Sequence, residues 1–349
     1  MSQSTILKTN QLSKYFPGVI ANENVDFLLY KGEVHCLFGE NGAGKSTLCS
    51  CLFGYHKPDS GRIELDGKLV KFRSPGDAIK CGIGMVHQHF VLVDDFTVLE
   101  NIIVGTNSKK WTLDLEKSKN ELRSICHEYE IDLKFNSLVR DLSVGEQQWV
   151  EILKSLYLDA EILILDEPTA VLTPEESKKL FNIIGKMSKN GISIILISHK
   201  ISEVMQADRV SVMSKGKLIN TISPKDTTPQ ELTNMMVGRE VTLRVKENKD
   251  IIMTTSSKPL LSVKKLNYLN KYKKFALNNV DLELYSGEIL GLAGVSGNGQ
   301  KELFEALSGN LVPDSGTIIY DGEEIQGKSS RYYMDLGIGL IPDDRYREG

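Results

Sequence analysis

The chain has 349 residues, of which 41% are hydrophobic and 25% charged, an ordinary globular composition with room for two domains or more. A formal net charge of −4 gives no basic surface for nucleic acid, so we expect no nucleic-acid partner. The five cysteines form no CxxC pair and predict reduced thiols rather than a metal site. Apolar runs are far shorter than the ~20 residues of a membrane helix, so any membrane role must come through a partner.

A phosphate-binding loop is the first functional motif along the chain. The apolar run Val34–Phe38 predicts a buried strand, a glycine-rich loop follows, and a helix is predicted from Ser46 onward. In this context the backbone N–H groups at the helix start bind phosphate oxygens, Lys45 reaches the β and γ phosphates, and the Ser46 hydroxyl is a Mg²⁺ ligand. The candidate nucleotide-binding residues of the loop are Gly39, Asn41, Gly42, Ala43, Gly44, Lys45, Ser46 and Thr47.

Two acids end a later apolar strand, Glu161–Glu167. Ligands of open α/β sheets lie at the carboxyl ends of the strands, so we expect Asp166 to hold Mg²⁺ through water and Glu167 to orient or deprotonate the attacking water. Thr173 and Glu176 then predict a capping box at the start of a helix.

The regions around these motifs are predicted to be regular. A segment that begins at Asp114 carries apolar residues at helical spacing, and His199 follows the apolar strand Ile192–Ser198. The apolar positions of the helical segment are Leu115, Leu122, Ile125, Cys126 and Tyr129.

The sequence repeats itself at an offset that places Gly39 on Gly294 and Pro58–Gly61 on Pro313–Gly316. We therefore expect one domain over residues 4–240, a linker over 241–258 and a second domain over 259–349. By this offset Gly349 corresponds to Asp94, so the second domain is expected to be an N-terminal portion without its own signature segment or acidic strand. Two explanations for the end at Gly349 remain open, which are a truncated gene and a sequence that was cut short.

The order and spacing of these motifs resemble the ATP-binding cassette (ABC) family. The segment Leu142–Gln148, which reads Leu-Ser-Val-Gly-Glu-Gln-Gln, lies between the phosphate loop and the acidic strand, as the family's signature does. The resemblance implies an α/β phosphate-loop ATPase domain with a helical subdomain. It also implies that ATP is sandwiched between the phosphate loop of one domain and the signature of another, which makes Ser143, Gly145 and Glu146 nucleotide-binding candidates.

The resemblance implies further roles for single residues. His199 takes the place of the family's γ-phosphate sensor, and Gln88 that of the glutamine that senses Mg²⁺ and the attacking water. Phe16 matches the aromatic on which adenine stacks, and Tyr15 is its rival because one residue of register separates them. The helical segment around residues 114–129 would receive the membrane subunit.

The second phosphate loop departs from the first. Gln300 stands where the lysine is expected, Lys301 replaces the Mg²⁺-binding hydroxyl, and Asp343 replaces Gln88. A neutral amide cannot replace an ammonium charge on phosphate, so we expect this site to bind ATP weakly and to hydrolyse it poorly. We also expect an uncovered apolar face formed by a strand over Ile289–Ala293 and by Leu303, Phe304 and Leu307.

One competent and one degenerate half resemble the fused ATPases of simple-sugar and nucleoside importers. We therefore expect an ATPase that uses ATP and Mg²⁺ to energise import of a nucleoside or, second, of a simple sugar of the ribose or galactose type. A soluble cassette protein and an inactive remnant are the remaining alternatives.

The importer hypothesis also predicts partners and a location. They are polytopic membrane permease subunits, an extracytoplasmic solute-binding protein that acts indirectly, and a second cassette domain in cis or in trans, at the cytoplasmic face of the cell membrane. Because the signature must come from another domain, we expect efficient hydrolysis only when two first domains pair head to tail.

Overall fold

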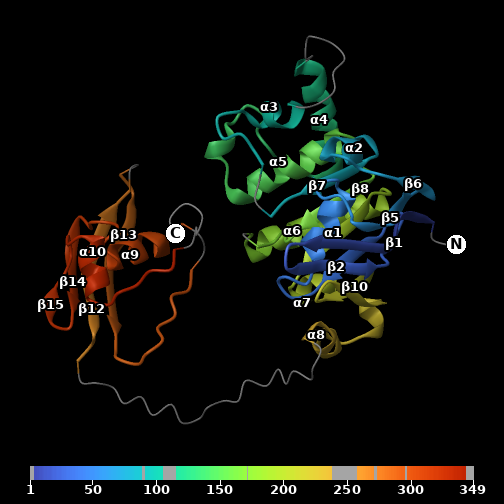
Figure 1. Cartoon of the computed structure of the whole chain (residues 1–349). Coiled ribbons are helices and arrows are strands. Elements are labelled where there is room, and N and C mark those ends of the chain that lie inside the picture. The colour runs from blue at the N-terminus through green and yellow to red at the C-terminus, as the bar shows by residue number, and fades with distance from the viewer. Residues whose placement is uncertain are drawn as a thin grey trace. The chain divides into compact units, whose positions relative to one another are not determined.

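The computed structural model describes residues 4–88, 91–104, 115–170, 172–237, 258–270, 273–294 and 297–342. Contacts between residues divide the chain into two units, Met1–Val245 and Lys246–Gly349 (Figure 1). Among the described residues, no helix is both long enough and apolar enough to span a membrane. Asp114, Asp343 and most of the predicted linker lie outside the described residues.

A mainly parallel sheet forms the centre of the first unit. Its described strands follow the order β11-β10-β4-β9-β8-β7, in which β10 to β7 are parallel and β11 is antiparallel to β10. Both faces are covered, which explains the continuous apolar runs in the sequence. The strands are β4 Val34–Phe38, β7 Ile83–Val86, β8 Ile162–Asp166, β9 Ser193–Ser198, β10 Arg209–Ser214 and β11 Lys217–Ile222.

Alternate residues of each central strand face two different layers. Cys36 and Phe38 of β4 pack in a core with helical side chains, whereas Leu37 packs with α1 and a second sheet. Figure 1 shows α3, α4 and α5 at one end of the first unit and α7 and α8 at the opposite end. The helices are α1 Lys45–Leu52, α2 Pro75–Lys80, α3 Val98–Ile103, α4 Leu115–Tyr129, α5 Val144–Tyr157, α6 Pro174–Lys189, α7 Ile201–Val204 and α8 Pro229–Val237.

The second sheet of the first unit is antiparallel, with the order β2-β1-β5-β6 and with β3 also paired to β1. It lies beside the phosphate loop, since the Asn22 side chain on β2 donates to the Gly44 carbonyl at 3.0 Å. Its strands are β1 Thr5–Phe16, β2 Val19–Val25, β3 Leu28–Tyr30, β5 Ser60–Leu65 and β6 Lys68–Val70.

Two helix predictions are confirmed. Helix α4 buries Leu122 and Tyr129, although Leu115 at its start is 49% exposed. Helix α6 begins with the predicted capping box, in which the Thr173 hydroxyl accepts the Glu176 N–H and the Glu176 carboxylate accepts the Thr173 N–H.

The second unit contains the antiparallel sheet β13-β12-β14-β15 and two described helices. Its small core includes Leu266, Ile318 and Tyr333. Its elements are β12 Leu261–Leu269, β13 Phe275–Leu284, β14 Ser315–Tyr320, β15 Glu323–Glu324, α9 Gln300–Leu307 and α10 Ser330–Asp335.

The strand expected at Ile289–Ala293 is wrong: these described residues form no strand, and Ile289 is 99% exposed. Its counterpart β4 is held by parallel pairing with β9 and β10. The predicted uncovered face is also partly wrong, because Leu303 is buried in the unit's core while Phe304 is 45% exposed.

Strand pairing locates a one-residue insertion in the repeat. Leu7 pairs with Leu65 in the first unit, and Leu261 pairs with Tyr320 in the second. The offset between equivalent residues is therefore one residue smaller for the pair Leu7 and Leu261 than for the pair Leu65 and Tyr320. The second copy has one extra residue after β12. The counterpart of Phe16 is therefore Asn270, which lacks an aromatic ring.

A buried polar group lies at the start of β4, the strand that leads to the phosphate loop. The His35 side chain is fully buried on β4, with Nε2 at 2.8 Å from the Ser211 hydroxyl and Nδ1 at 3.1 Å from the Arg209 guanidinium. Arg209 also donates to the Glu33 carboxylate at 2.5 Å and lies over the Tyr30 ring. These side-chain contacts connect β4 to β10 in addition to the hydrogen bonds of the sheet.

This histidine predicts a pH-dependent stability. Burial lowers the pKa of His35, so the folded chain keeps the imidazole neutral where the unfolded chain, with an ordinary value of 6.5, takes up a proton. The stability contributed by neutral His35 is complete above that value and is lost as pH falls through the lowered folded pKa. We expect His35→Gln to reduce the difference between the free energies of unfolding measured by urea at about pH 7.5 and about pH 5.5.

The matched control is His127→Gln, since His127 is exposed on α4. It should leave the pH dependence as it is. A His35→Gln chain with the parent's full pH dependence would contradict the assignment.

Candidate ATPase site

The phosphate loop has the predicted strand–loop–helix context, between the end of β4 and the start of α1. Gly42 and Gly44 have φ values of +82° and +98°, a region that side chains disfavour. A Cβ atom at Gly44 would also collide with the Ala21 carbonyl, and one at Gly39 with the Met213 carbonyl. The loop is therefore enclosed by neighbouring backbone, and Gly39 and Gly44 cannot be replaced without displacing it.

Lys45, the first residue of α1, folds back across the loop. Its ammonium group donates to the Gly39 carbonyl at 2.7 Å and to the Glu40 carbonyl at 2.8 Å, and the residue is 5% exposed. Burial lowers the pKa of Lys45, although Glu167 and Asp166 oppose this shift. The charge is thus positioned in the loop, bonded to neutral carbonyls that phosphate oxygens can replace.

Asp166 and Ser46 form an oxygen pair beside the loop. The Ser46 hydroxyl lies 3.4 Å from Asp166 Oδ1, and Asp166 is 8% exposed at the end of β8. Burial raises the pKa of Asp166, while the Ser46 hydrogen bond and the charge of Lys45 lower it. A hydroxyl next to a partly desolvated carboxylate is a donor set that suits Mg²⁺, so the residues fit the expected ion.

Glu167 lies at the centre of three converging side chains. The Gln88 amide donates to Glu167 Oε2 at 3.1 Å, and His199 Nδ1 lies 3.0 Å from Glu167 Oε1. These residues follow β8, β7 and β9, whose carboxyl ends meet at one edge of the sheet. Glu167 also has a φ of +47°, an uncommon conformation for a residue with a side chain and one often found at functional sites.

A buried polar group behind this centre was missed by sequence reasoning. Glu203 on α7 is 5% exposed and accepts hydrogen bonds from the hydroxyls of Thr169 and Ser198. Lys200 donates to the Thr169 carbonyl and hydroxyl, each at 2.9 Å. These hydrogen bonds connect the turn after Glu167 to the end of β9, which His199 follows. In the sequence, the only signal for Glu203 is its position four residues after His199.

The signature segment forms the start of α5. Ser143 is the N-cap, its hydroxyl accepts the Glu146 N–H, and the Glu146 carboxylate accepts the Ser143 N–H at 2.8 Å. Gly145 is buried against α6, where an added Cβ would lie 2.7 Å from the Glu176 carboxylate. Ser143 and Glu146 are exposed, so the helix start is open to a partner.

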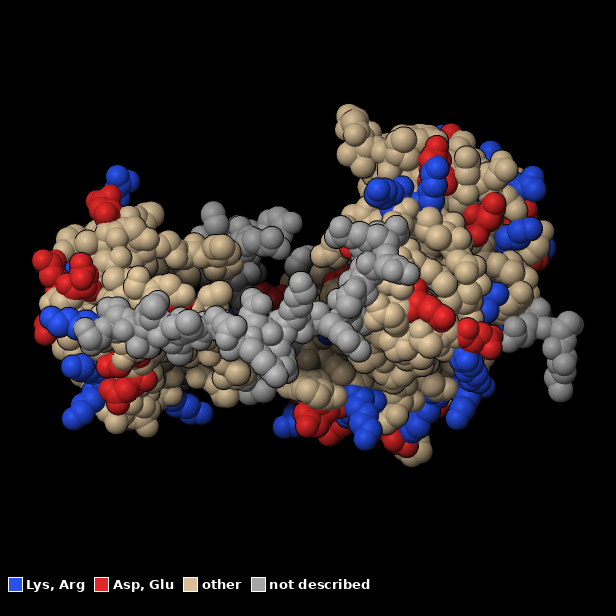
Figure 2. Space-filling model, turned by 90° about the horizontal axis from the view of Figure 1, so that it is seen from below, with Lys and Arg blue, Asp and Glu red and all other residues tan. Residues whose placement is uncertain are grey.

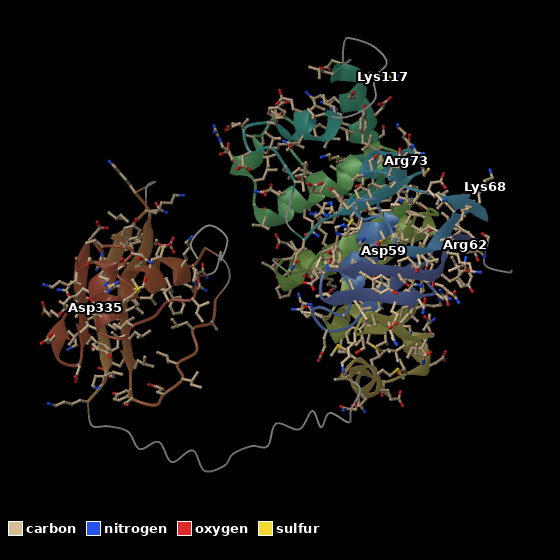
Figure 3. All side chains as sticks on the ribbon, in the orientation of Figure 1. Asp59, Arg62, Lys68, Arg73, Lys117 and Asp335 are labelled. Carbon is tan, nitrogen blue, oxygen red and sulfur yellow. The ribbon has the colours of Figure 1, made fainter. Side chains whose placement is uncertain are left out.

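The two aromatic candidates for adenine stacking lie at the end of β1. Phe16 is 37% exposed, with its ring edge-on to His56 at 5.2 Å, and Tyr15 is 44% exposed. Asp59, labelled in Figure 3, fixes the strand end by accepting the Tyr15 N–H at 2.7 Å. Asp314 accepts the Leu269 N–H in the same way in the second unit, where the next residue is Asn270.

The described part of the second phosphate loop repeats the helix start of the first and has an amide in place of the lysine. Helix α9 begins at Gln300 directly after Gly299, which has a φ of +93°, as α1 begins after Gly44. The Gln300 amide lies against Gly294, much as Lys45 lies against Gly39. The described helix starts are therefore similar, and they differ in charge at Lys45 and Gln300.

A glycine-rich loop that holds a lysine, with acids, a glutamine and a histidine converging beside it, defines a phosphate-loop ATPase. The model of the ABC transporter family matches residues 22–170 and 277–346. A solved ATP-binding cassette of an ABC transporter in its ADP conformation superposes with a TM-score of 0.60 at 25% identity, covering 67% of this chain and 99% of that structure.

Whole-chain relatives agree with this class. A nucleoside import ATP-binding protein of Lactococcus lactis is 42% identical over 100% of this chain and 69% of its own length. A glucose import ATP-binding protein of Haloferax volcanii is 39% identical over 100% of this chain and 68% of its own length. A guanosine import ATP-binding protein of Bacillus subtilis is 44% identical over 99% of this chain and 67% of its own length. The chain belongs to the ABC transporter family, as one of its ATP-binding, ATP-hydrolysing subunits.

The two loops predict unequal nucleotide binding. Lys45→Ala removes a charge-assisted contact to phosphate and should weaken ATP binding by roughly 1.5–3 kcal/mol, about tenfold to a hundredfold, in calorimetry. Gln300→Ala is the matched change in the second loop and should alter the affinity little. Equal losses from the two changes would show that the asymmetry is wrong.

Proposed function

We propose that the chain energises the import of a nucleoside by hydrolysing ATP at the loop Gly39–Ser46. The observation that carries this proposal is the position of Glu167, which is held between Gln88 and His199 at the strand end beside Asp166. A carboxylate held in this way can orient a water molecule and accept its proton. The proposed nucleotide contacts also include the loop residues named above, an aromatic at Phe16, and Ser143, Gly145 and Glu146 of a second cassette.

Different residues of the chain bind the phosphates, hold Mg²⁺ and orient the attacking water. The N–H groups of Gly42 to Lys45 bind phosphate oxygens at the start of α1, and Lys45 exchanges its two carbonyl acceptors for the β and γ phosphates. Ser46, and Asp166 through water, would hold Mg²⁺, which neutralises phosphate charge. Gln88 and His199 can each exchange the bond to Glu167 for one to the attacking water or to the γ-phosphate.

This division predicts the effect of a neutral isostere at Glu167. Glu167→Gln keeps the size and the hydrogen-bonding capacity but cannot accept a proton, so single-turnover hydrolysis should fall about 10²–10⁴-fold while ATP affinity is retained. Glu175→Gln, on the exposed start of α6, is the control. Hydrolysis by Glu167→Gln at the parent's rate would assign the role to another residue, first of all His199.

The partners follow from the proposed transport role. Exposed apolar residues gather on the loop before α3 and at its end, among them Val91, Val93, Phe96 and Val104, and this end of the unit would receive a membrane permease subunit. On the described surface seen in Figure 2, basic and acidic side chains are intermingled, so this face offers no single-sign patch for a nucleic acid. The chain would then act at the cytoplasmic face of the membrane, with a solute-binding protein on the other side.

The nucleoside is proposed over a simple sugar because two of the relatives above are named for nucleoside or guanosine import. In cells that lack this gene, we expect uptake of labelled guanosine to be lost and uptake of labelled ribose to continue. The parent gene should restore uptake, and a Lys45→Ala copy should not. Loss of ribose uptake with intact nucleoside uptake would instead support the sugar importer.

A further inference from the structure

The loop that follows Gln88 is held by two buried polar side chains from the helical part of the first unit. Glu151 on α5 accepts the Val91 N–H at 2.8 Å. Asn101 on α3 accepts the Val93 N–H at 2.8 Å and donates to the Val93 carbonyl at 3.0 Å. The phosphate-loop ATPase described above does not use either side chain.

Glu151 is unusual for its burial. Its exposed fraction is 5%, and a buried carboxylate is costly unless hydrogen bonds compensate for the lost water. Its Oε1 receives a main-chain N–H, so the bond fixes the position of the backbone and does not depend on the Val91 side chain, which is 63% exposed. The carboxylate therefore serves to hold the loop.

Asn101 fixes the remainder of the same loop. It is 3% exposed, and its amide also reaches the carbonyls of Phe96 and Thr97 at 3.4 and 3.2 Å. The loop is thus attached to α5 at Val91 and to α3 at Val93. At its other end, Gln88 bonds to Glu167.

Helix α5 consequently makes two connections. Its start is the exposed signature segment at Ser143, and two turns further on its Glu151 holds the loop of Gln88. A shift of α5 that keeps this hydrogen bond would move the Val91 main chain with it. Gln88 lies three residues before Val91 in the sequence, so such a shift would also act on the Gln88–Glu167 hydrogen bond.

We propose that Glu151 is a positioning residue that links the signature helix to the water-orienting pair Gln88–Glu167, through its hydrogen bond to the Val91 N–H. The proposal rests on the proposed roles of Glu167 and Gln88. It adds a residue that acts on catalysis without touching the nucleotide.

The test uses the full chain and compares ATP affinity by calorimetry with single-turnover hydrolysis. Glu151→Ala should retain ATP affinity and lose hydrolysis about tenfold to a hundredfold, because the attacking water is no longer held in place. Glu151→Gln should restore most of the rate, since its amide oxygen still accepts the Val91 N–H. Glu116→Ala, at an exposed position on α4, is the control.

A second pair of variants removes the same bond from the other side. Val91→Pro deletes the donor N–H, and Val91→Ala keeps it. We expect Val91→Pro to lose hydrolysis as Glu151→Ala does, Val91→Ala to retain it, and the double variant Glu151→Ala/Val91→Pro to be no slower than either single one. This non-additivity is what a shared bond requires and a general loss of folding would not give.

Parent-like hydrolysis by Glu151→Ala, failure of Glu151→Gln to restore the rate, or additive losses in the double variant would overturn the proposal. Glu167→Gln separates these outcomes from a failure of the proposed function. If Glu167→Gln hydrolyses ATP normally, the assignment of Glu167 itself is wrong. If Glu167→Gln loses hydrolysis but the Glu151 and Val91 variants hydrolyse ATP normally, the proposed function holds and only the positioning role of Glu151 is wrong.

Discussion

Parallel pairing of β7, β8, β9 and β4 is the constraint on which the first site depends. Parallel strands end at the same edge of a sheet, so residues far apart in the sequence emerge together there. Gln88, Glu167 and His199 meet in this way, and the phosphate loop follows the strand next to β9. The buried group around Glu203 and the hydrogen bond from Glu151 then fix the loops that leave this edge.

The second unit shows that part of the loop's geometry is set locally. Gly299 and α9 reproduce the turn of the first phosphate loop, because this shape depends on local backbone conformation. The apolar run at Ile289–Ala293 does not become a strand, because a parallel strand depends on neighbours for its hydrogen bonds. Gln300 and Asn270 further remove the ammonium charge and the aromatic ring that the first unit has at Lys45 and Phe16. The two units therefore differ in chemistry at these two positions.

Sequence reasoning succeeded where the determinants are local. The phosphate loop, the capping box at Thr173 and the acidic strand end are each set by residues within one short segment, and the structure has them as predicted. It missed Glu203 and Glu151, whose partners Thr169 and Val91 lie 34 and 60 residues away. Neither acid differs in the sequence from a solvated surface residue, and only the fold shows that they are buried. The strand expected at Ile289–Ala293 was wrong because a strand depends on pairing with residues far away in the sequence, which an apolar run does not show by itself.

The central claim is that the first phosphate loop, and not the second, carries the chemistry for ATP. The most direct test is the number of nucleotides bound per chain at saturating ATP and Mg²⁺, measured by native mass spectrometry and equilibrium dialysis. The account predicts one tightly bound ATP per chain. Two molecules bound with equal affinity would contradict it.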